Sequence, residues 1–280
     1  MASTQARESA VRSSDGPMAA GVGGPTRASI GVRTLRQDRW WLYPAVTFTV
    51  FTAFVVYSTI RAFMGRDYFA EPYLSPFYSP CLGDCVEGAS DFGQPFGWFP
   101  LSAALIILIF PLGFRLTCYY YRKAYYRSFW LSPPACGVAE PHAAYSGETR
   151  FPLIFQNAHR WFWYATFVIA VILTWDVILA FGPAPGEPDG IHMGLGTVLM
   201  LINVVFIWLY QVSCHSCRHI VGGRLRHFSK HPVRYRLWTW VSKLNARHAN
   251  YAWLSLFSVA LVDLYIFLLA SGVIDDPRFF

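Results

Sequence analysis

The stretch NYAWLSLFSVALVDLYIFLLASGV, residues 250–273, decides the fold because it is long, apolar and carries a single charged side chain, Asp263. A hydrocarbon core of ~30 Å is crossed by ~20 helical residues that rise 1.5 Å each. Comparable stretches lie at about 41–63, 97–120, 161–183 and 192–213. None shows the strict alternation of a membrane β-strand. We therefore predict an all-α integral membrane protein, a bundle of five transmembrane helices.

The charges predict how this bundle is oriented. Of the 23 lysines and arginines, 20 lie in residues 1–40, 114–160 and 214–249, which the five helices place on one side. Basic loops stay in the cytoplasm, so we expect a cytoplasmic N-terminus and an external C-terminus. The net charge of +7 then reflects topology rather than nucleic-acid binding. The expected location is the plasma (cell inner) membrane, as a multi-pass protein.

Two regions outside the helices carry local predictions. Residues 1–35 are rich in Ala, Ser, Gly and Pro and lack the apolar run of a signal peptide, so we expect a disordered cytoplasmic tail before a membrane domain at 36–280. In the external loop, Cys81 and Cys85 can close a disulfide on the oxidising side. The alternatives are free thiols or weak metal ligands. We find no internal repeat in the sequence.

Four helix ends deliver thiols and imidazoles to the cytoplasmic side, which is how helical bundles build metal sites. We expect the ligands Cys118, His159, Cys214 and His248, one from each of the second to fifth helices. Two Cys and two His suit a Rieske-type [2Fe–2S] cluster or structural zinc. One haem b between facing histidines is a further alternative. The alternate ligands are His215, Cys217 and His219.

Other candidate residues are polar groups in or beside the predicted spans. Asp176 and Asp263 are acids inside the membrane, where charge is costly, so they are candidates for proton uptake or quinone binding. A paired carboxylate that joins two helices is the alternative. At the cytoplasmic ends, Tyr119, Arg160 and Trp161 are candidate quinone-binding residues, although interfacial anchoring explains the aromatic side chains as well.

The five-helix layout with these residues resembles the membrane-anchor (cytochrome b-type) subunit of succinate dehydrogenase/fumarate reductase. The segments that carry the likeness are TCYYYRKAYYRSFWLSPPAC (117–136), GETRFPLIFQNAHRWFWY (147–164), CHSCRHIVGG (214–223) and NARHANYAW (245–253). They are most similar to a haem-poor actinobacterial branch, over roughly residues 35–273. Histidines are missing from the first two helices, which departs from the di-haem pattern and favours the iron–sulfur centre.

The resemblance implies a function. Such an anchor docks a flavoprotein and an iron–sulfur subunit and passes electrons from succinate to a quinone, here expected to be menaquinone. The chain would hold no dehydrogenase site of its own, and it shows no Gly-rich nucleotide loop. A higher oligomer is compatible with this role. The first rival function is a zinc-stabilised membrane scaffold. The second, which the sequence favours less, is a proton or solute transporter that uses the two intramembrane acids.

Overall fold

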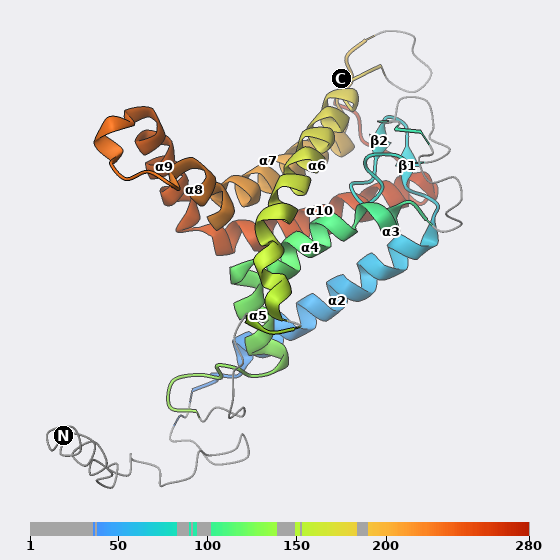
Figure 1. Ribbon diagram of the computed structural model, residues 1–280. Helices are drawn as coiled ribbons and strands as arrows, with labels where there is room; N and C mark the ends of the chain where they lie inside the picture. Colours follow the sequence, from blue (N-terminus) through green and yellow to red (C-terminus); the bar gives the residue numbers. More distant parts are fainter. Residues whose placement is uncertain are drawn as a thin grey trace, which may run out of the picture. The chain divides into compact units, whose positions relative to one another are not determined.

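The computed structural model describes residues 36, 38–82, 90, 92–93, 102–138, 149–151, 153–183 and 190–279. This part is mostly helical, with one short antiparallel pair of strands, β1 (Phe69–Ala70) and β2 (Tyr73–Leu74) (Figure 1). Within the described residues, four helical segments are long and apolar enough to cross a membrane. They are α2 (Leu42–Met64), η2 with α6 (Leu153–Ala158, His159–Leu179), α7 (Leu195–Ser213) and α10 (His248–Ala270). The prediction of a helical membrane bundle is confirmed.

The predicted second span is broken rather than continuous. It consists of α3 (Ala104–Ile107) and α4 (Ile109–Thr117), followed after Cys118 by α5 (Tyr119–Phe129) at a bend of 76°. The break before α4 has a simple cause, because Pro111 lacks the N–H that would bond the carbonyl of Ile107. Counting this bent pair as one span gives up to five crossings. The count of five and the sides of the two termini stay predictions.

The chain divides into two compact units, residues 1–47 with 125–145 and residues 48–124 with 146–280. In the first unit, Arg36 pairs with Asp38 and donates a hydrogen bond of 2.9 Å to the carbonyl oxygen of Cys136. The predicted tail at 1–35 lies outside the described residues. The second unit holds the packed helices α4, α6, α7 and α10 and every candidate site residue discussed below.

A buried ion pair joins α2 to α10 at the end of the bundle that carries the strand pair. Asp263 accepts hydrogen bonds from Arg61 Nε at 2.8 Å, from the Tyr57 hydroxyl at 2.5 Å and from Ser75. Arg61 also donates to the carbonyl oxygen of Asp67 at 3.1 Å. Asp263 is therefore the paired carboxylate that joins two helices, the alternative considered in the sequence. The loop that follows α2 is attached to this ion pair through Asp67 and Ser75.

Two other predictions concern this same end of the bundle. Asp176 is buried, and one of its carboxylate oxygens accepts a hydrogen bond from Ser79 while the other has no partner in the part of the chain described. Cys81 is disulfide-bonded, and Cys85 lies outside the described residues. Hydrogen bonds from Ser75 to Asp263 and from Ser79 to Asp176 therefore attach the loop after α2 to α10 and α6.

Between α7 and α10 the chain forms three separate helices, of which the first continues the end of the predicted fourth span and the other two lie where only a basic loop was predicted. They are α8 (His215–Gly222), η3 (Phe228–Lys230) and α9 (Pro232–Asn245). Pro232 opens α9, at a position where its missing N–H costs nothing. Arg234 donates to the carbonyl oxygen of Val221 at 2.8 Å, and the Arg218 guanidinium lies 5.0 Å from the Trp238 ring. These contacts pack α9 against α8.

A candidate metal centre at four helix ends

The four favoured ligands occupy equivalent places on two pairs of helices. Cys118 follows α4 and Cys214 follows α7. The backbone of each cysteine is extended, so one helix stops there and the next helix starts at the following residue. His159 is the first residue of α6, and His248 is the first residue of α10. Both cysteines and His248 are buried, and His159 is half-buried. The cysteines at the two helix breaks and the histidines at the two helix starts therefore bring four ligating side chains together.

The four side chains meet as two Cys–His pairs. His159 Nε2 lies 3.1 Å from the Sγ of Cys214, and His248 Nε2 lies 3.4 Å from the Sγ of Cys118. The two cysteines are close enough to interact electrostatically, and so are the two histidines. All four favoured ligands thus lie in one cluster, although no group of three or more His, Cys, Asp or Glu in the described residues already has the arrangement of a metal site.

Both imidazoles are oriented by a hydroxyl on the ring nitrogen that faces away from the thiol. Thr117 Oγ1 lies 2.9 Å from His159 Nδ1, and Ser213 Oγ lies 2.7 Å from His248 Nδ1. Ligating histidines in metalloproteins are held in this way through their second nitrogen, which fixes the tautomer and the ring orientation. The Nε2 atoms are therefore the ones presented for ligation.

An aromatic ring also stacks on each imidazole. In each case the aromatic residue lies four positions, about one helical turn, before the cysteine. Phe114 stacks on His159 with ring centroids 4.9 Å apart, and Tyr210 stacks on His248 at 5.0 Å. The Tyr210 hydroxyl is buried and has no hydrogen-bond partner in the described part of the chain. Burial raises the pKa of the Cys214 thiol to about 12, with a further contribution from Cys118. A bound metal ion reverses this preference because it deprotonates a coordinating thiol.

These contacts repeat, because the chain contains two copies of the same arrangement. FRLTC (114–118) and YQVSC (210–214) align position by position. Arg115 donates to the carbonyl oxygen of Ala252 at 3.3 Å, and Gln211 donates to that of Trp163 at 2.8 Å. Each also bonds the hydroxyl three residues after that carbonyl. Exchanging the halves α4–α6 and α7–α10 reproduces the partners in each of the contacts named above, which is the property of a two-fold relation.

The remaining predicted site residues make none of these contacts, although His215 is close enough to interact electrostatically with His159 and His248. His215 and His219 are exposed on α8 with ring centroids 5.3 Å apart, and Cys217 is buried without bonding the four ligands in any contact described. Tyr119 and Trp161 are 66% and 74% exposed, so both face outward. The exposed Arg160 follows His159. The structure brings together the favoured four and leaves the alternates and the predicted quinone residues outside.

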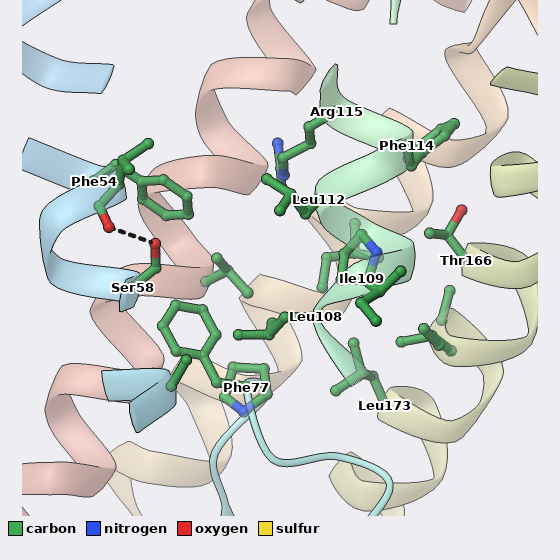
Figure 2. A pocket seen from close by; sticks show the side chains of 18 of the residues that line it. Phe54, Ser58, Phe77, Leu108, Ile109, Leu112, Phe114, Arg115, Thr166 and Leu173 are labelled. Atoms are coloured by element: carbon green, nitrogen blue, oxygen red, sulfur yellow. Dashed lines mark hydrogen bonds between the residues drawn. The ribbon is translucent and has the colours of Figure 1, made fainter. Parts of the chain in front are cut away.

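A cavity of about 300 Å³ begins beside the cluster and runs between the helices. Figure 2 shows Phe114 and Arg115 near one end and Phe77 near the other. Its walls are mostly apolar, and Tyr210, Gln211 and Thr166 add polar atoms near the end that carries Arg115. Apolar walls with a few polar groups are typical of a small-molecule site. Sequence reasoning missed Arg115 and Tyr210, which a comparison of residues 114–118 with 210–214 would have singled out.

The model of the actinobacterial succinate dehydrogenase subunit SdhC family matches residues 42–272. The chain belongs to this family. As an SdhC-family protein it is a multi-pass membrane anchor of succinate dehydrogenase, which confirms the resemblance found in the sequence.

A solved structure supports the same assignment for this SdhC-family chain. It is a chain from the "Mycobacterium smegmatis Sdh1 complex in the apo form", with 56% sequence identity and a TM-score of 0.81. The match covers 94% of the present chain and 100% of the other. No curated protein matches. The anchor role within succinate dehydrogenase is therefore shown.

Proposed function

We propose that this SdhC-family anchor carries electrons to a quinone through a Rieske-type [2Fe–2S] cluster held by Cys118, His159, Cys214 and His248. The observation that carries the proposal is the two-fold relation, which makes the two cysteines equivalent to each other and the two histidines equivalent to each other. A Rieske centre has two Cys on one iron and two His on the other. Equivalent ligand pairs are what such a centre requires.

The residues present fit this group in three respects. The donor set has the two thiols and two imidazoles, the second nitrogen of each imidazole is held by Thr117 or Ser213, and the apolar surroundings keep water away. When bound, the cluster would supply one-electron transfer at a higher potential than an all-cysteine cluster. Zinc uses the same donor set and remains the rival cofactor, whereas one haem b would use the histidines alone.

The cavity beside the cluster is our proposed quinone site. Its apolar walls suit the ring and isoprenoid chain of a quinone such as menaquinone, and Arg115 and Tyr210 can donate hydrogen bonds to a carbonyl oxygen. Arg115 has no carboxylate partner in the part of the chain that the structure describes. An arginine of this kind inside a membrane segment marks a functional site, and its charge would favour a reduced, more negative quinone. The exposed Tyr119, Arg160 and Trp161 remain the alternative site.

The partners of the anchor follow from the same role. We propose that a flavoprotein and an iron–sulfur subunit dock on the cytoplasmic side, where basic residues gather and attract acidic surfaces. The residues of this docking surface would be Arg122, Lys123, Arg127, Arg218 and Arg224. Succinate would be oxidised in those partners, because the sequence of this chain shows no dehydrogenase motif.

Replacing one cysteine tests the cofactor assignment. Cys118→Ser in the purified complex should remove two iron atoms and two acid-labile sulfides per anchor chain, because the cluster loses one ligand. Cys217→Ser is the matched control, since Cys217 is also buried and reduced but lies outside the cluster. Unchanged iron in Cys118→Ser, or bound zinc in the unsubstituted complex, would reject the iron–sulfur proposal.

A further inference from the structure

The helix α9 has two apolar faces, and only one of them is used inside the protein. Trp238 packs against Arg218 of α8, and Val241 is buried. A second stripe is formed by Val233, Leu237 and Trp240, which are 68%, 49% and 54% exposed. Their spacing of i, i+4 and i+7 places them on one side of a helix with 3.6 residues per turn. Apolar surface of this kind needs an apolar partner.

The charges around the stripe are of one sign. Residues 214–249 contain eight lysines and arginines and no acidic residue. On α9 itself, Arg236 and Lys243 are exposed and lie one turn from the stripe residues on the side away from α8. Helices that lie in a membrane surface combine an apolar stripe with tryptophan and a basic flank. The complementary surface is a leaflet that contains anionic lipids.

Both ends of the α8–α9 hairpin are attached to membrane-crossing helices at the same level. Cys214 alone separates α7 from α8, and two residues separate α9 from α10. Asn245 Nδ2, at the end of α9, donates to the carbonyl oxygen of Ser213, at the end of α7, with a distance of 2.7 Å. Figure 1 shows α8 and α9 lying to one side of the ends of α7 and α10. The hairpin is therefore held where the lipid head groups begin.

We propose that α9 is a membrane-surface anchor whose stripe of Val233, Leu237 and Trp240 inserts into the boundary between head groups and acyl chains of an anionic leaflet. Arg236 and Lys243 bind the lipid phosphates beside it. Tryptophan prefers this boundary, and three side chains in one row fit a shallow insertion. The inference does not depend on the identity of the metal or on the quinone site, because it rests on the exposed face of α9 alone.

Photo-crosslinking in the intact complex identifies what covers the stripe. The complex is placed in nanodiscs that contain phosphatidylglycerol and phosphatidylcholine, with benzoylphenylalanine at Leu237 or at Tyr235. Tyr235 is the matched control because it is 46% exposed but lies on the opposite side of α9. We expect lipid adducts at position 237 at least fivefold more abundant than at 235. Equal lipid labelling at the two positions, or a protein adduct at 237 with another subunit, would overturn the proposal.

The charge requirement is tested in the same nanodiscs. Arg236→Gln with Lys243→Gln should lower the ratio of phosphatidylglycerol to phosphatidylcholine among the adducts at position 237, because the attraction for anionic head groups is lost. Arg66→Gln is the control, since Arg66 is exposed in the loop after α2. A ratio that is the same in the double variant and in the control would show that the basic flank does not select anionic lipid.

Discussion

Replacing Asp263 with leucine should destabilise the bundle more than any other single change at the end that carries the strand pair. The carboxylate and its partner Arg61 have side chains only 0% and 2% exposed, so the charge left on Arg61 cannot reach water. Removing one member of such a buried pair costs about 3–5 kcal/mol. Tyr57 and Ser75 also lose the oxygen to which they donate.

The expected change is large enough to measure by thermal unfolding of the purified complex. For a chain of this size, about 3–5 kcal/mol corresponds to a decrease of about 6–20 °C in the apparent unfolding temperature. The double variant Asp263→Leu with Arg61→Met should be less destabilised than Asp263→Leu, because it no longer buries an unpaired charge. An Asp263→Leu protein that unfolds within about 2 °C of the wild type, well below that range, would refute the reasoning.

Three further predictions concern the cluster and its supports. Gly113→Ala would place a Cβ 2.3 Å from Phe162 Cε1, so we expect overpacking between α4 and α6 to cost about 1–3 kcal/mol, measured by thermal unfolding. Arg115→Gln removes a positive charge that acts on Cys118, so the midpoint potential of the centre should fall by about 59 mV, a tenfold change for one electron, measured by redox titration. Thr117→Val and Ser213→Ala should each weaken metal retention about 10–100-fold against a chelator.

Each of these predictions has a distinct contrary result. Wild-type stability of Gly113→Ala would mean that α4 and α6 separate at no cost. A redox titration of Arg115→Gln that shows the signal at an unchanged potential would remove the arginine from the electrostatics of the centre, while leaving the centre itself in place. Metal retention equal to wild type in both hydroxyl variants would show that the imidazoles need no support from Thr117 and Ser213.

The membrane fold was accessible to sequence reasoning because long apolar runs have one physical solution in lipid. Stretches such as 250–273 must satisfy their backbone hydrogen bonds internally, which leaves a helix. The breaks at Cys118 and Cys214 were not predicted, since nothing in the residue types there forbids a continuing helix. The residues of α8 were expected only as the end of the fourth span, and α9 was missed because its polar and apolar residues are mixed and its packing depends on contacts such as that of Arg218 with Trp238.

The candidate site was predicted in its residue types but not in its symmetry. The grouping of Cys118, His159, Cys214 and His248 followed from their places at helix ends. The two-fold relation, and with it the roles of Arg115 and Tyr210, rests on the contacts that two segments 96 positions apart in the sequence make to the first turns of α6 and α10. The two segments share only one identical residue, the cysteine, and three similar ones. A match this short cannot be distinguished from chance until the contacts are known.

The most direct test of the central claim is the low-temperature EPR and optical spectrum of the purified complex, recorded before and after reduction, for wild type and for Cys214→Ser. The account predicts a reduced Rieske-type signal in the wild type that is absent from Cys214→Ser, with no Soret band in either protein. A sharp reduced Soret band would instead place a haem between the histidines. Identical iron–sulfur signals in both proteins, with zinc bound in the wild type, would contradict the role of this site in electron transfer.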